Sequence, residues 1–151
     1  MIVGLLDTNV LVYSIDWRFE PKRRRALDLI ERLADLEAAA LSVQVLSEFF
    51  NVSTRKLVPP LHPEEAIEKI ETFAYLFPVF DLTLSTVFEA ALGVQNHSFS
   101  YYDAQLWATA KLNQIPLIFS EDFNSGATIE GVTFVNPFEE EFRLEDWITL
   151  T

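Results

Sequence analysis

Short apolar runs alternate with longer amphipathic segments along this chain. The segments 2–6, 116–119 and 132–135 are almost entirely apolar. Runs of this length with so few polar positions are typical of strands buried on both faces of a sheet. Val79 and Phe80 predict a further, shorter strand.

The segments between these runs have the pattern of helices. Apolar positions recur at helical spacing in the segment 21–37. A proline followed by two acids at 63–65 is typical of a first helical turn, and Ser100 with Asp103 matches a capping box. Helices are therefore predicted over 21–37, 43–57, from 63 onward, 84–95 and 101–113. Strands separated by helices indicate an α/β fold with a parallel sheet covered on both faces.

Length and composition narrow the class of protein. The chain has 151 residues, 50% of them hydrophobic, so one globular domain is expected at roughly 100–200 residues per domain. With no cysteine, a disulfide framework, a thiolate metal site and a cysteine nucleophile are excluded. No signal peptide or membrane-length apolar run is present, which predicts a soluble, cytoplasmic protein without a membrane partner.

Charge is unevenly distributed along the chain. There are 23 acidic against 11 basic residues, a net charge of −12, which by itself argues against binding to nucleic acid. However, six of the 11 basic residues lie between positions 18 and 32, where only three acids accompany them. The total charge is therefore a poor guide to any one face. This basic run is interpreted either as a solvated helix face or as a contact for an acidic partner.

Acidic residues follow two of the predicted strands. Asp7 ends the first strand, and Glu121 and Asp122 come just after the strand at 116–119. Ligands of open α/β sheets bind beyond the carboxyl ends of the strands, so these acids mark a candidate site. The simpler alternative for Asp7 is that it caps a following helix or forms a turn.

Two further acids lie on predicted helices. Glu48 belongs to a polar stripe made up of Gln44, Glu48, Asn51 and Arg55. Such a stripe is ordinarily a solvent-facing surface, and Asp103 is fully explained by the predicted capping box. Two histidines in unrelated contexts argue against a zinc hydrolase, and four scattered glycines form no phosphate-binding loop.

In chain order, the segments that carry these acids resemble the PIN domain family. The matching segments are Leu5-Leu-Asp7-Thr-Asn-Val-Leu-Val-Tyr13, Ser42-Val-Gln-Val-Leu-Ser-Glu48-Phe-Phe-Asn51, Ser100-Tyr-Tyr-Asp103-Ala-Gln-Leu-Trp-Ala-Thr-Ala110, and Ser120-Glu-Asp122-Phe-Asn-Ser-Gly126 followed by Val132-Thr-Phe-Val-Asn-Pro-Phe138. The resemblance covers about residues 2–138. It predicts a PIN-like nuclease domain over 1–138, with 139–151 as an acidic extension of the same domain.

By pattern, the sequence is most similar to the VapC-type toxins of bacterial and archaeal toxin–antitoxin pairs. This resemblance implies a three-layer α/β/α sandwich with a mostly parallel sheet and an endoribonuclease that depends on Mg²⁺ or Mn²⁺. It also implies an RNA substrate, a homodimer and inhibition by a cognate antitoxin protein.

The resemblance assigns roles to individual residues. The catalytic acids are expected to be Asp7, Glu48, Asp103 and Asp122. Of these, Asp7 and Asp103 would bind the metal directly, with Glu48 and Asp122 in support. Glu121 is adjacent to Asp122 and remains an alternative fourth acid. Substrate contacts are expected from Thr8, Asn9, Arg23, Arg24 and Arg55, with stacking faces from Trp17, Tyr101 or Tyr102.

Clustered carboxylates fit this chemistry because they repel one another unless a hard cation compensates. Oxygen ligands without histidine or cysteine favour Mg²⁺ or Mn²⁺ over zinc. The number of ions and the choice between the two metals stay open. Two other functions are considered: a catalytically silent PIN-like protein- or RNA-binding module, and a phosphotransfer enzyme with Asp7 as nucleophile. The second is disfavoured because Asn9 stands where such enzymes need another aspartate.

Overall fold

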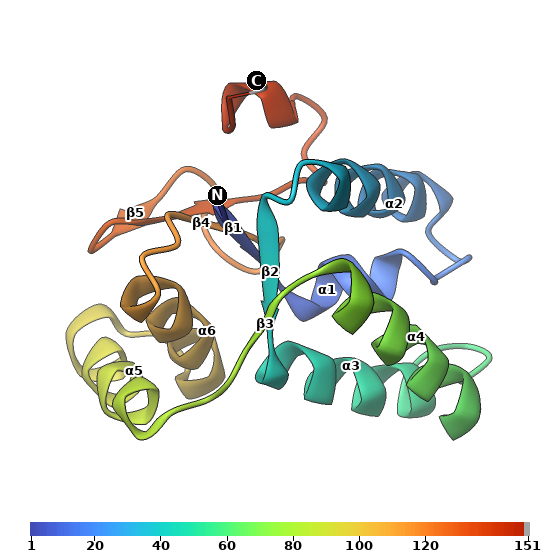
Figure 1. Ribbon diagram of the computed structural model, residues 1–151, viewed down its shortest axis with the longest axis horizontal. Helices are drawn as coiled ribbons and strands as arrows, with labels where there is room; N and C mark the ends of the chain where they lie inside the picture. Colours follow the sequence, from blue (N-terminus) through green and yellow to red (C-terminus); the bar gives the residue numbers. More distant parts are fainter. Residues whose placement is uncertain (150–151) are drawn as a thin grey trace.

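A six-stranded, mostly parallel sheet forms the centre of the protein in the computed structural model, which describes residues 1–149 (Figure 1). The strands lie in the order β3-β2-β1-β4-β6-β5, and only the pair β5–β6 is antiparallel. Their bounds are β1 Gly4–Leu6, β2 Ala39–Ser42, β3 Val79–Phe80, β4 Leu117–Phe119, β5 Thr128–Ile129 and β6 Val132–Val135. The predicted α/β class is confirmed.

Helices lie on both sides of the sheet, which gives the three-layer arrangement (Figure 1). Their bounds are α1 Thr8–Tyr13, α2 Glu20–Asp35, α3 Val43–Arg55, α4 Pro63–Leu76, α5 Leu84–His97 and α6 Tyr101–Leu112, with a short 3₁₀ helix at Leu144–Asp146. Figure 1 shows α5 and α6 as a pair, separated by the sheet from α2. Within residues 1–149, no helix combines the length and apolar character that a membrane span requires.

The central strands are buried on both faces, as their apolar runs predict. All residues of β1 and β4 are buried, and the two strands pair from Gly4–Leu117 to Leu6–Phe119. Gly4 makes room for the Phe119 ring, since a Cβ atom there would lie 2.5 Å from Cε2 of Phe119. The carboxyl ends of β1 and β4 therefore lie side by side.

Two elements near the site were not predicted. β2 was missed because its Ala-Ala-Leu-Ser sequence is short and directly precedes a helix. The helix α1 follows β1 with only Asp7 between them, so the strand signal ends where the helix begins. The predicted helix over 21–37 ends earlier, at Asp35, and Glu37 takes a positive φ of 50°.

The segment 139–149 packs against α2. The Arg25 guanidinium donates hydrogen bonds to the carbonyl oxygens of Glu139 at 2.6 Å and Glu140 at 3.2 Å. Leu144 and Ile148 are buried in the core. Residues 150–151 of the proposed extension lie outside the described residues.

Candidate active site

Asp7 lies where β1 ends and α1 begins. Its Oδ1 accepts a hydrogen bond from the backbone N–H of Thr8 at 2.7 Å, and it is the N-cap residue of α1. Its Oδ2 accepts a hydrogen bond from the Ser120 hydroxyl, just beyond β4, at 2.7 Å. The alternative that Asp7 caps a helix is therefore confirmed. The same carboxylate also joins the ends of the two central strands.

The Asp7 carboxyl has a strongly perturbed pKa. The pKa is raised from 3.8 to about 7, and burial is the largest cause of the rise. The hydrogen bonds from Ser120 and Thr8 oppose the rise, and the negative charges of Asp122 and Glu48 contribute to it. Since two close donors do not offset burial, the site favours a proton or a cation beside Asp7.

Asn9 connects Asp7 to Asp122. Its Nδ2 donates to Asp122 Oδ2 at 3.1 Å and to Ser120 Oγ at 3.1 Å, and lies 3.5 Å from Asp7 Oδ2. The Asp122 backbone N–H also donates to Ser120 Oγ, at 3.1 Å. Sequence reasoning did not assign Ser120 a role; its place between the strand at 116–119 and Asp122 is the signal that could have found it.

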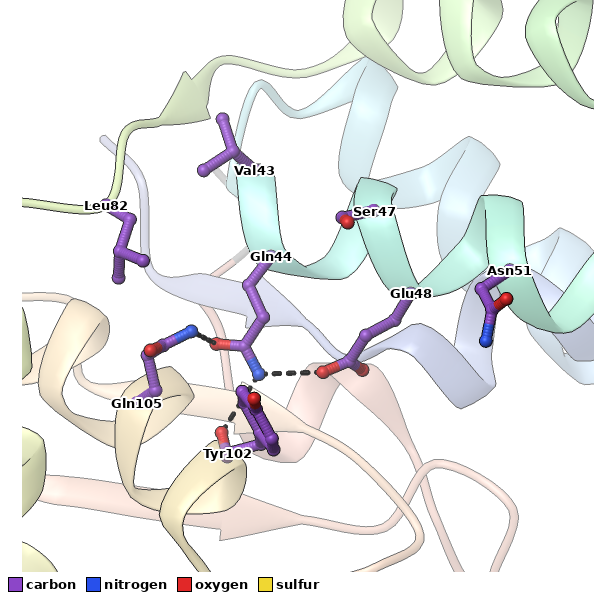
Figure 2. A pocket seen from close by; sticks show the side chains of 8 residues that line it. All are labelled: Val43, Gln44, Ser47, Glu48, Asn51, Leu82, Tyr102 and Gln105. Atoms are coloured by element: carbon purple, nitrogen blue, oxygen red, sulfur yellow. Dashed lines mark hydrogen bonds between the residues drawn. The ribbon is translucent and has the colours of Figure 1, made fainter.

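Glu48 projects from α3 toward the same region. Its Oε2 accepts a hydrogen bond from the Thr8 hydroxyl at 2.7 Å, and its Oε1 accepts one from Gln44 at 2.9 Å. Gln44 also donates to the Tyr102 carbonyl and accepts from Gln105, each at 2.9 Å (Figure 2). The interpretation of this stripe as a simple solvent-facing surface is therefore wrong for Gln44 and Glu48, which connect α3 to α1 and α6.

Asp103 lies in the first turn of α6. Ser100 is the N-cap residue, but its side chain makes no capping hydrogen bond, so the predicted capping box is wrong. The pKa of Asp103 is raised, and burial is the largest cause of the rise. The side-chain interaction with Ser100 lowers the pKa, whereas the negative charges of Asp122 and Glu48 raise it. Asp103 and Asp122 also line one pocket of about 280 Å³.

The adjacent acids Glu121 and Asp122 have different hydrogen-bond partners. Glu121 accepts hydrogen bonds from the Tyr13 hydroxyl at 2.6 Å and from Lys22 at 2.8 Å. Asp122, by contrast, is bonded to Asn9 and contributes to the raised pKa values of both Asp7 and Asp103. The geometry therefore favours Asp122 as the fourth acid of the cluster.

Within residues 1–149, the predicted basic contacts form no hydrogen bond or ion pair with these four acids. The Arg23 guanidinium donates two hydrogen bonds to Glu20 and stacks on Trp17, with 3.6 Å from Cζ to the ring centroid. Arg24 also donates to Glu20 but is more exposed, and Arg55 lies exposed at the end of α3. None of the three arginines lines either of the two pockets that Glu48 borders.

The donor set fits a hard divalent cation. Within residues 1–149, no three acidic or histidine side chains converge closely enough to form a complete metal site. Nevertheless, the available donors are oxygens, Asp7 is buried with a raised pKa, and the buried Oδ1 of Asn9 has no partner among the described residues. Carboxylate and carbonyl oxygens are ligands that suit Mg²⁺ and Mn²⁺.

Comparison with known proteins places this geometry in context. The sequence model of the PIN domain matches residues 4–125. No curated protein sequence matches the chain.

Solved structures share the fold. The structure of FitAB bound to a DNA fragment is similar at a TM-score of 0.68 and 20% identity, over 92% of this chain and 98% of that chain. A toxin–antitoxin complex from Klebsiella pneumoniae has a TM-score of 0.64 and 19% identity, over 90% and 98% of the two chains. VapC20 from Mycobacterium tuberculosis, described as a toxin that cleaves the sarcin–ricin loop, has a TM-score of 0.60 and 17% identity, over 84% and 97%.

Proposed function

Because this chain belongs to the PIN domain family, whose sequence model matches residues 4–125, we propose that it is a metal-dependent endoribonuclease and the toxin of a toxin–antitoxin pair. The observation that carries this proposal is the electrostatic cluster of four acids from distant segments. Asp7 and Asp103 each have a pKa that the charges of Asp122 and Glu48 raise. Such a cluster is unfavourable without a cation, and a bound cation attracts phosphate.

Asp7 and Asp103 would hold Mg²⁺ or Mn²⁺, with Glu48 and Asp122 in support. When bound, the ion would polarise the scissile phosphate and lower the pKa of an attacking water. Thr8 holds Glu48 through its hydroxyl, and Asn9 holds Asp122 through its amide.

Asp122 is the exposed member of the cluster, and its Oδ2 is bonded to Asn9. We assign its Oδ1 to receive the proton of the water that attacks the phosphodiester. The cut then leaves one fragment with the phosphate and the other with a free hydroxyl.

The proposed role includes partners. Several similar structures are complexes of VapBC or FitAB type, and the VapBC and FitAB structures are described as bound to DNA. These support a cognate antitoxin as the protein partner here. A homodimer and a cytoplasmic location belong to the same proposal, together with phosphate contacts from Arg23, Arg24 and Arg55.

Cleavage of RNA in the presence of Mg²⁺ or Mn²⁺ tests the enzyme proposal. We expect the substitutions Asp7→Asn and Asp103→Asn each to slow cleavage by roughly 100-fold or more, because the loss of even a partner of a metal ligand costs roughly 10–100-fold. Glu31→Gln is the matched control, since Glu31 is exposed on α2 and its side chain forms no hydrogen bond or salt bridge within residues 1–149.

Metal-replete wild-type protein that leaves ribosomal, transfer and messenger RNA intact, and whose expression is harmless to cells, would contradict the toxin proposal. Calorimetry that detects no divalent binding at the acids would instead favour a catalytically silent binding module. Sequencing of the cleaved RNA ends, compared between wild type and Asp7→Asn, separates cleavage by this protein from contamination.

A further inference from the structure

A hollow of about 690 Å³ opens beside Glu48, between the start of α3 and the start of α6 (Figure 2). We call it the Tyr102 pocket. Its lining residues are Val43, Gln44, Ser47, Glu48, Asn51, Leu82, Tyr102 and Gln105. This volume is within the range of about 300–1,000 Å³ that is usual for small-molecule sites.

The chemistry of this lining favours a neutral, planar ligand. Glu48 is the only acidic residue of the lining, and no arginine or lysine belongs to it. A phosphate group here would therefore meet a carboxylate with no compensating positive charge. Tyr102 is 65% exposed, and Val43 and Leu82 add apolar surface to the pocket.

Some polar side chains of the pocket already form hydrogen bonds within the protein, whereas Asn51 is available to a ligand. The Gln44 amide is engaged on both of its atoms by Glu48, Tyr102 and Gln105. The side chain of Asn51 is exposed at the edge of the pocket and makes no hydrogen bond within residues 1–149. It can offer one donor and one acceptor side by side, which is what the edge of a nucleobase requires.

The pocket is continuous with the acidic cluster. Glu48 lines both the Tyr102 pocket and a second hollow of about 360 Å³, which Thr8, Asn9 and Asp122 also line. A nucleotide whose base occupies the first hollow would have its phosphate group directed toward the acids. The neutral base of the nucleotide would then lie in the Tyr102 pocket. Its charged phosphate would lie beside the acids, where a cation would bind.

We propose that the Tyr102 pocket binds one unpaired nucleobase of the RNA substrate, with its face on the Tyr102 ring and its edge on the Asn51 amide. The pocket thus selects the base next to the scissile phosphate. This inference rests on the proposed ribonuclease function and adds a specificity-determining subsite to it.

Cleavage of an RNA pool with randomised sequence, followed by sequencing of the new ends, measures the base preference at each position. For the wild type we expect a preference at one position beside the cut. Tyr102→Ala should slow cleavage about tenfold at RNA concentrations below saturation, because the stacking face is lost for every base. Asn51→Leu should change which base is preferred, whereas Tyr102→Phe should retain the wild-type rate.

Tyr75→Ala is the matched control, because Tyr75 is 89% exposed on α4 and lines neither hollow. Folding is not at risk in Tyr102→Ala, since Gln44 binds the backbone carbonyl of Tyr102 rather than its side chain. Affinity for short RNAs that differ in one base, measured in chelator with the Asp7→Asn protein, provides a second readout that needs no cleavage.

The outcomes distinguish the two proposals. If wild-type protein cleaves RNA but Tyr102→Ala keeps its rate and Asn51→Leu keeps its base preference, the subsite is wrong and the ribonuclease proposal stands. If wild type cleaves no RNA, the ribonuclease proposal fails, and equal affinity for all single-base variants then overturns the subsite as well. Loss of antitoxin binding in Tyr102→Ala with unchanged cut sites would assign the pocket to a protein partner and overturn the inference.

Discussion

At the scale of single residues, Asp7 combines two roles that sequence reasoning treated as alternatives. It caps α1 through Thr8, and it is a buried acid whose hydrogen-bond donors do not balance its desolvation. The groups that bridge Asp7 and Asp122 within residues 1–149, the Asn9 amide and the Ser120 hydroxyl, carry no net charge. In the absence of a cation, the Asp7 carboxylate therefore lowers the stability of the folded state.

This leads to a prediction for metal-free protein. Because the pKa of Asp7 is raised to about 7 in the folded state, its favourable contribution is complete below pH 3.8 and is lost as the pH rises through about 7. Asp7→Asn keeps a neutral cap that accepts from Thr8. We expect this variant to have a higher free energy of unfolding at pH 8, by roughly 4 kcal/mol at most, and a much smaller advantage near pH 4.

Urea denaturation in chelator at pH 4, 6 and 8 measures this difference. An advantage of Asp7→Asn that is the same at all three pH values would show that the titration of Asp7 is not its cause.

At the scale of elements, the sequence predicted long helices more accurately than short strands, because a longer element repeats its apolar pattern more often. Long helices such as α2 and α3 have several turns of apolar period and were located to within about two residues. β2 was missed because its pairing with β1 and β3 depends on distant segments that no local pattern reveals.

The same reasoning explains which residues of the candidate site could be placed from the sequence. Asp7 and Asp122 could be placed from the sequence because each follows a strand of a parallel sheet, whose carboxyl ends meet. The amide chain from Gln105 through Gln44 to Glu48 could not, because it depends on the packing of α6 against α3. Family resemblance located Glu48 and Asp103, but only the structure gives their partners.

The packing of α5 against α6 allows a second prediction. Gly93 of α5 faces the fully buried Trp107 of α6, and a Cβ atom there would lie 2.7 Å from the Trp107 ring. The ring is also held by its Nε1, which donates to the Ile129 carbonyl at 3.1 Å. We expect Gly93→Ala to lower the free energy of unfolding by about 1–3 kcal/mol, although alanine is the better helix former.

Chemical denaturation of Gly93→Ala beside Gln95→Ala measures this effect, since Gln95 is exposed on the same helix. A Gly93→Ala protein as stable as the wild type would show that the Trp107 ring can move aside.

At the scale of the whole molecule, much of the basic run at 18–32 is neutralised internally. The ion pairs are Arg18–Asp16, Lys22–Glu121, Arg23–Glu20, Arg24–Glu20, Arg32–Asp28 and Arg32–Glu145. With a net charge of −12, little positive potential remains for a phosphate backbone. Binding of RNA should therefore depend on a few local charges rather than on a broad basic surface.

A third prediction concerns ionic strength. For the Asp7→Asn protein with Mg²⁺, the double substitution Arg24→Gln and Arg55→Gln should weaken RNA binding. It should also reduce the slope of log affinity against log salt concentration by roughly 0.7 for each phosphate that an arginine no longer neutralises. Arg23→Gln should change the slope less, because its guanidinium is engaged with Glu20 and Trp17.

Fluorescence anisotropy across a salt series provides the measurement, with Lys69→Gln on the exposed face of α4 as the control. Equal slopes for the Asp7→Asn protein with and without the double substitution would exclude Arg24 and Arg55 from phosphate binding.

The position of β4 in the sheet has a consequence for biosynthesis. β4 lies between β1 and β6, although 110 residues separate it from β1 in the chain. A nascent chain that has left the ribosome only as far as α6 has Asp7, Glu48 and Asp103 but lacks Ser120 and Asp122, and β1 has no partner on that side. The four acids can therefore assemble only after β4 and Asp122 have left the ribosome, so the candidate site is incomplete while the segments before them are being synthesised.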